Sequence, residues 1–149
     1  MNESINTSFL IMIVAVIITV IAVLMITFFS YSRAYKTKNK IIDIIESHNG
    51  YNNAAKTEIE QYLTDVGYNI RRNSNACPRY NGQNSIDNSS NYAFCVYRFA
   101  TNKKDYSDNK EYSAGYYYTT YIFVNINIPI INDMVELKVK GQSRTIYEI

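Results

Sequence analysis

The stretch Phe9–Phe29, which reads FLIMIVAVIITVIAVLMITFF, is an unbroken apolar run of 21 residues without charge, glycine or proline. A helix rises about 1.5 Å per residue, so a run of this length matches the ~30 Å hydrocarbon core of a bilayer. Lipid offers no partner to backbone amides, and a helix pairs them all within one segment. We therefore predict a transmembrane helix over residues 9–30. A buried core helix is the alternative.

Residues 1–8 form a leader that lacks both the basic start and the small-residue cleavage site of a signal peptide. We therefore expect the apolar run to stay in the protein as a membrane anchor. The side chains to which we assign the membrane contact are Phe9, Ile13, Ile17, Val20, Leu24 and Phe28.

Two features give opposite indications of the orientation in the membrane. The basic residues Arg33, Lys36, Lys38 and Lys40 follow the apolar run, which favours a cytoplasmic C-terminal part by the positive-inside rule. The cysteine pair and the loops rich in Tyr and Asn favour the outside. We expect residues 31–149 to form one extracytoplasmic domain on the cell surface, with the basic residues near anionic headgroups. The cytoplasmic orientation remains the alternative.

The chain has two cysteines, Cys77 and Cys95. In an exported domain such a pair indicates a disulfide, and a loop of this size would add about 3 kcal/mol of stability. Two unrelated thiols are the alternative. Neither cysteine has a Cys or His partner at the spacing of metal ligands, so we expect no metal site.

The helical pattern continues past the apolar run. Isoleucines from Ile41 to Ile45 alternate with charged residues at helical spacing, which predicts a helix that ends at His48, before Asn49-Gly50. A second helix is predicted from Asn53 to Val66, with Gly67 closing it. The residues expected on its buried face are Ala55, Ile59, Tyr62, Leu63 and Val66.

Alternating patterns then predict strands at Tyr92–Phe99, Tyr116–Ile128 and Val135–Val139. The segment Ala100–Ser113 reads as a polar loop, and Gly141 as a β-bulge. Helices followed by strands indicate an α+β fold: a long N-terminal transmembrane helix with an amphipathic extension, a short second helix and an antiparallel sheet of three to four strands.

The pattern offers no catalytic site. His48 is the single histidine and lacks a partner for acid–base chemistry. We expect no enzyme activity, no cofactor and no small-molecule substrate, and the net charge of +2 does not favour a nucleic-acid partner. A tyrosine cluster is the candidate contact surface, with ordinary sheet packing as the alternative. It comprises Tyr116, Tyr117, Tyr118 and Tyr121, and strand alternation predicts Tyr117 and Tyr121 on the face opposite Ile122 and Val124.

Three segments give the chain a resemblance to pilin-like proteins, and most of all to TadE-like minor pilins of tight-adherence (Tad) pilus systems. They are the stretch YSRAYKTKNKIIDIIESHNGY after the anchor, the short helix ending at Gly67, and the strand pair YIFVNINIPIINDMVELKVKGQSRTI. Such pilins usually carry a glutamate early in the mature helix. The apolar run has none, so we assign no processing site.

The resemblance implies a structural subunit of a surface pilus, secretion or conjugation apparatus that acts by non-covalent assembly. Its expected partners are membrane lipid and other pilin-like subunits or assembly-platform membrane proteins. A single-pass extracytoplasmic adhesion or binding module that does not polymerise is the alternative.

Overall fold

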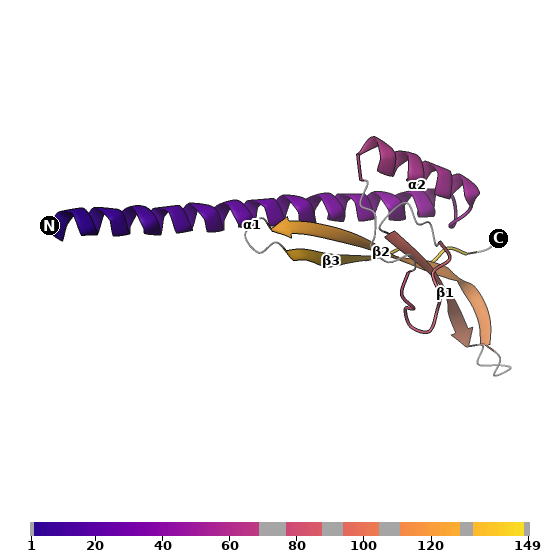
Figure 1. Cartoon of the computed structure of the whole chain (residues 1–149). Coiled ribbons are helices and arrows are strands. Elements are labelled where there is room, and N and C mark those ends of the chain that lie inside the picture. Colours follow the sequence, from indigo (N-terminus) through magenta and orange to yellow (C-terminus); the bar gives the residue numbers. More distant parts are fainter. Residues whose placement is uncertain (1, 69–76, 88–93, 105–110, 129–132, 148–149) are drawn as a thin grey trace.

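A computed structural model describes residues 2–68, 77–87, 94–104, 111–128 and 133–147. Two helices are followed by three strands, which confirms the predicted α+β class. Figure 1 shows a long helix whose first half projects from a small head formed by the rest of the described chain. The elements are α1 (Asn2–Ser47), α2 (Asn53–Asp65), β1 (Phe94–Lys104), β2 (Glu111–Ile128) and β3 (Asp133–Gln142).

Helix α1 is continuous from the leader through the apolar run into the head. It ends within a residue of the predicted position. Asn49 and Gly50 have positive φ angles of 51° and 137°, and the Gly50 amide donates to the carbonyl of Ile45 (2.8 Å). A glycine suits this position because a Cβ there would stand 2.9 Å from the hydroxyl of Tyr118.

Helix α2 lies beside the second half of α1 and runs antiparallel to it (Figure 1). Asn52 caps its start by accepting a hydrogen bond from the Ala55 amide (2.9 Å). At its end, Arg33 of α1 donates to the carbonyl of Val66. The predicted face of α2 is confirmed: Ala55, Ile59 and Leu63 are buried, and Tyr62 and Val66 pack against the same cluster.

The strands form one antiparallel sheet in the order β1-β2-β3. The prediction of a loop over Ala100–Ser113 was wrong at both ends, because β1 continues to Lys104 and β2 begins at Glu111. The charged residues of this segment favoured a loop, but an antiparallel pair of strands can also carry polar residues on faces that are open to solvent. The sequence pattern also predicts a short strand over Tyr68–Arg72, and residues 69–72 of it lie outside the described residues.

Gly141 does not form the predicted β-bulge. The register of β2 with β3 runs without a shift from Thr119–Gln142 to Ile128–Asp133. Gly141 instead lies where α1 crosses the sheet, and a Cβ on it would collide with Ile42 and Lys38. Its role is therefore to allow the close approach of helix and strand.

The two faces of the sheet carry different clusters. The face toward the helices forms the main core with α1 and α2, and includes Phe94, Val96, Ile122 and Val139. The opposite face, called here the outer face, carries Cys95, Tyr97 and Phe123. The loop 77–87 packs against this outer face through Cys77 and Tyr80.

Candidate functional site

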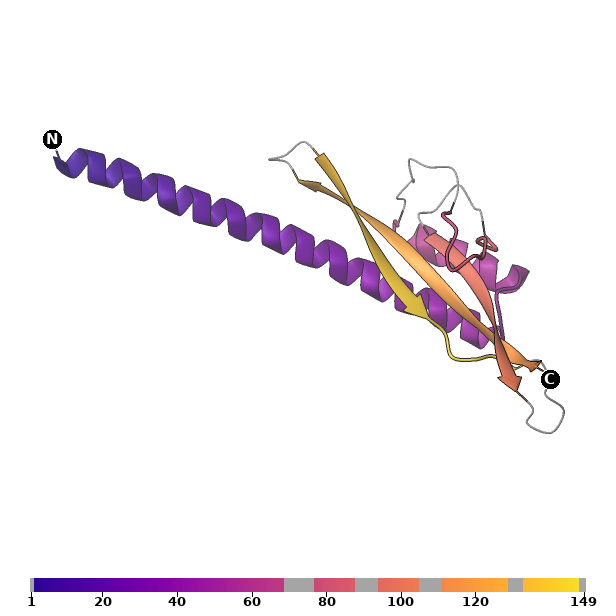
Figure 2. The ribbon, with the colours of Figure 1, turned by 90° about the horizontal axis from the view of Figure 1, so that it is seen from below.

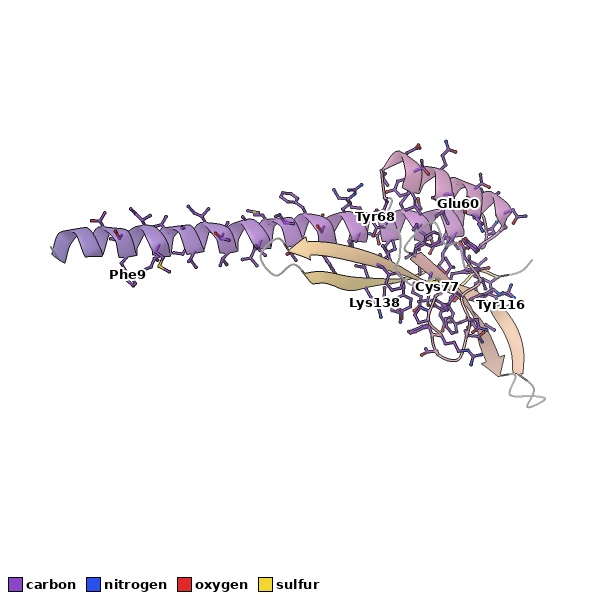
Figure 3. All side chains as sticks on the ribbon, viewed as in Figure 1. Phe9, Glu60, Tyr68, Cys77, Tyr116 and Lys138 are labelled. Atoms are coloured by element: carbon purple, nitrogen blue, oxygen red, sulfur yellow. A yellow bond between two sulfur atoms is a disulfide. The ribbon has the colours of Figure 1, made fainter. Side chains whose placement is uncertain are left out.

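The first half of α1 contributes no residue to the buried core found among the described residues. It is the one helix of the described chain that is long and apolar enough to cross a membrane, and none of its most apolar segment is buried. The six side chains predicted to contact the membrane are each at least 42 % exposed. Figure 3 shows side chains projecting from this part of the helix, with Phe9 labelled near the free end. An apolar surface this large needs lipid or another protein to cover it.

The second half of α1 is part of the head's core. Ala34, Ile41, Ile44 and Ile45 are buried against α2 and the sheet. The same helix is therefore bare at one end and fully packed at the other. This division falls between Phe29, the end of the apolar run, and Ala34.

Three of the four basic residues beyond the apolar run have contacts with residues of the head. Arg33 holds the C-terminal end of α2. Lys38 is only 8 % exposed, and its ammonium lies 4.1 Å from the centre of the Tyr35 ring. Lys40 pairs with Asp43 (3.5 Å). These contacts give the three cations structural roles in the folded head, besides any role in setting the orientation of the chain in a membrane.

Cys77 and Cys95 form the predicted disulfide, with their Cα atoms 5.8 Å apart. Cys95 is buried in β1, and the bond ties the loop that begins at Cys77 to the outer face of the sheet. Disulfides persist in oxidising compartments, which supports an extracytoplasmic head. Within the described residues no group of His, Cys, Asp and Glu could hold a metal ion.

A buried carboxylate that the sequence did not reveal closes the same loop. Asp87 is 3 % exposed, accepts a hydrogen bond from the Tyr51 hydroxyl, and pairs with Lys56 of α2 (3.4 Å). Burial, and next the hydrogen bond to Asp87, raises the pKa of Tyr51 above its ordinary value near 10. Ser85 adds hydrogen bonds to the carbonyls of Asp87 (2.6 Å) and Val96 (3.0 Å). These contacts bind the loop to α2 and β1.

The outer face carries an aromatic cluster built around Tyr80 of the loop. The Tyr80 ring centre lies 5.0 Å from that of Tyr121 and 5.6 Å from that of Tyr97. Lys140 of β3 donates to the Tyr80 hydroxyl (2.6 Å), and this hydrogen bond is the main reason that the pKa of Tyr80 is lowered. Burial raises the pKa of Tyr121.

The structure separates the four tyrosines of the candidate contact surface. Tyr118 is only 7 % exposed and belongs to the core. Tyr121 packs in the aromatic cluster, Tyr117 stacks on Phe99, and the guanidinium of Arg98 lies 4.6 Å from the centre of the Tyr116 ring. The sequence placed Tyr117 and Tyr121 correctly on the face opposite Ile122. It did not reveal that the chain's own loop covers part of that face.

A polar cleft of about 400 Å³ opens where α2 begins, beside the sheet. It is lined by Tyr51, Asn52, Asn53, Lys56, Ile86, Arg98 and Tyr118. None of these residues is a cysteine, histidine or carboxylate. The one histidine, His48, lies at the end of α1 and pairs with Glu58 of α2 (2.7 Å), where it joins the two helices.

The fold and the disulfide together give the chain a pilin-like architecture: a long apolar N-terminal helix packed at its far end on a small antiparallel sheet. Comparisons with protein families, with curated proteins and with solved structures found no match. The finer resemblance to TadE-like pilins therefore rests on the sequence segments given above.

Proposed function

We propose that this chain is a membrane-anchored, pilin-like structural subunit, most similar to TadE-like minor pilins, of a surface pilus, secretion or conjugation apparatus. It acts by non-covalent assembly and has no enzymatic step. The anchor holds the subunit in the membrane until the exposed helix meets a neighbouring subunit or a membrane protein of the assembly platform.

The observation that carries this proposal is the division of α1 into a bare half and a packed half. A helix that only anchors a domain needs no rigid connection to it, whereas here Ala34–Ile45 of the same helix form the core. The head is therefore fixed to the anchor, and the bare half is presented in one orientation. Such a rod can pack against copies of itself along its apolar surface.

An outward orientation of the head is supported by the disulfide and by the uses found for Arg33, Lys38 and Lys40 within the fold. Lys36 is exposed and makes no ion pair among the described residues. An exposed cation at this position can meet lipid headgroups.

Crosslinking in intact membranes tests assembly. One cysteine is added at a time along α1, while the Cys77–Cys95 disulfide stays oxidised. Positions on the bare surface, such as Phe28→Cys, should form crosslinked species with another subunit. Ile44→Cys is the matched control on the same helix, because Ile44 is buried in the head's core. It should not crosslink.

If no position from Ile11 to Phe29 crosslinks to any protein while the chain is correctly inserted, the subunit does not assemble through α1. The proposal is then wrong, and the non-polymerising adhesion module takes its place. A crosslink to a different membrane protein supports assembly and identifies the partner.

A further inference from the structure

The sheet has two hairpin ends that lie at opposite ends of the head. In both views the end of β2 and the start of β3 point toward the bare half of α1, and the end of β1 and the start of β2 point away from it (Figure 1, Figure 2). We propose that the β2–β3 end contacts the lipid bilayer beside the anchor, so that the head rests on the membrane at two places. This inference depends on α1 crossing the membrane, and it is independent of assembly.

The register of the sheet shows how far this end extends. Gly141 packs against Lys38 of α1 and pairs with Thr120 of β2. From Thr120 to Ile128, the last residue of β2, eight steps of ~3.3 Å give about 26 Å of strand. From Lys38 back to Phe29, nine helical steps of ~1.5 Å give about 14 Å. Even a strand inclined by about 45° to the helix advances about 18 Å along it, which carries Ile128 past the end of the apolar run.

A layer of cations marks the level at which the head meets the membrane. The Arg33 guanidinium lies 6.0 Å from the centre of the Tyr68 ring, and the Tyr68 hydroxyl donates to the carbonyl of Phe123 (2.9 Å). Lys138 of β3 lies 5.9 Å from the centre of the Phe123 ring. Lys138 thus lies near Phe123, and Arg33 lies near the tyrosine that bonds the Phe123 carbonyl. Both cations are exposed, as cations facing anionic headgroups would be. Residues of β2 beyond Phe123 lie on the membrane side of this layer.

The composition of the two hairpin ends agrees with this placement. From Tyr116 to Asn132 the sequence has no charged residue, and β2 closes with Ile126 and Ile128. At the other end of the sheet β1 closes with Lys103 and Lys104, and β2 begins with Glu111. Toward the membrane β2 is uncharged and the charges, Asp133 and Glu136, are on β3 alone, whereas both strands carry charge at the end that faces away.

Asp133 limits the depth of insertion. It starts β3 and pairs with Ile128 in the register. A carboxylate is costly within the hydrocarbon layer. We therefore place this end of the sheet at the boundary between headgroups and acyl chains.

The absence of tryptophan from the chain makes a direct test available. Single tryptophans are placed in the full-length, disulfide-bonded protein as Ile128→Trp, Phe28→Trp or Tyr147→Trp. Each variant is reconstituted at high lipid-to-protein ratio in phosphatidylcholine vesicles with or without brominated acyl chains. Circular dichroism confirms that each variant is folded. Phe28 is on the anchor, and Tyr147 is an exposed residue of the head.

Bromine quenches tryptophan only at close range, so Ile128→Trp and Phe28→Trp should each lose most of their emission, whereas Tyr147→Trp should keep it. Quenching of Phe28→Trp without quenching of Ile128→Trp would overturn the inference and leave the anchor intact. Blue-shifted but unquenched emission from Ile128→Trp would also overturn it, because the hairpin end would then lie against protein. An unquenched Phe28→Trp would contradict the membrane anchor itself.

As a second measurement, Ile128→Cys carrying an environment-sensitive fluorophore should shift its emission to the blue when vesicles are added. The same label on Gln142→Cys, an exposed position at the other end of β3, should not shift. A label at Ile128→Cys that stays unshifted would contradict the inference even if the tryptophan variant failed to fold.

Discussion

Gly141 of β3 lies directly against Lys38 of α1: a Cβ on Gly141 would stand 2.6 Å from Cδ of the lysine. The same Cβ would also collide with the side chain of Ile42. The membrane helix and the last strand therefore meet at a point with no room for a methyl group. This contact fixes the angle between the anchor and the head.

Replacing Gly141 with alanine should destabilise the head. Overpacking of a tight contact typically costs about 1–3 kcal/mol, which here opposes the small gain that alanine normally brings to a strand. The free energy of unfolding of the full chain in detergent measures the effect. Gln142→Ala, at the exposed neighbouring position, should change it by less than about 0.5 kcal/mol. Wild-type stability in Gly141→Ala would show that helix and sheet do not meet here.

Replacing Thr120 with valine should leave the stability unchanged or raise it by up to about 1 kcal/mol. Thr120 is fully buried, and its hydroxyl has no hydrogen-bond partner among the described residues. Removal of an unsatisfied buried hydroxyl is close to neutral or favourable. Ser85→Ala is the contrasting variant and should cost about 1–3 kcal/mol, because the Ser85 hydroxyl bonds the carbonyls of Asp87 and Val96. A large loss in Thr120→Val would reveal an unseen partner.

Removing the disulfide with Cys77→Ala and Cys95→Ala together should lower the free energy of unfolding by about 3 kcal/mol, since the bond closes a loop of 18 residues. A reducing agent should destabilise the wild type by a similar amount. It should leave the double variant unaffected, so the double variant is the control for other effects of the reductant. Equal stability of oxidised and reduced wild type would contradict the expectation. Thiol labelling of whole cells would report the compartment of the head at the same time.

Stability should fall as the pH rises above 10. Burial raises the pKa values of Tyr51, Tyr68 and Tyr121 above the ordinary value near 10, which the unfolded chain retains. In that range the folded chain holds protons that the unfolded chain has lost, so each further pH unit favours unfolding. Denaturant unfolding at several pH values between 8 and 11 measures the slope. Tyr51→Phe should make the slope shallower, and an unchanged slope would show that Tyr51 ionises equally in both states.

The local elements of this fold were readable from the sequence. The apolar run, the stop at Asn49-Gly50 and the Asn52 cap each depend on neighbouring residues and on one backbone preference. The faces of α2 and β2 follow from periodicity alone. The Cys77–Cys95 bond was predictable because an exported chain with two cysteines offers one intramolecular pairing.

Contacts between distant segments were not readable. The residues around Gly141 do not indicate that α1 crosses the sheet there. The hydrogen bond from Arg33 to the end of α2 depends on how the two helices pack. The burial of Asp87 could not be predicted, because it depends on contacts with segments distant in the sequence. The extension of β1 to Lys104 was not predicted, because pairing with β2 stabilises it and its own polar sequence does not show a strand pattern.

Because α1 is continuous from the apolar run into the core of the head, the head must move whenever the apolar half of α1 changes its tilt. At ~1.5 Å per residue its 46 residues form a rod of about 69 Å, and a tilt of about 10° in the bilayer would swing the far end by about 12 Å. Changes in lipid thickness or a push from a neighbour would thus be transmitted to the distal surface as a lever transmits them, without any hinge to absorb the motion.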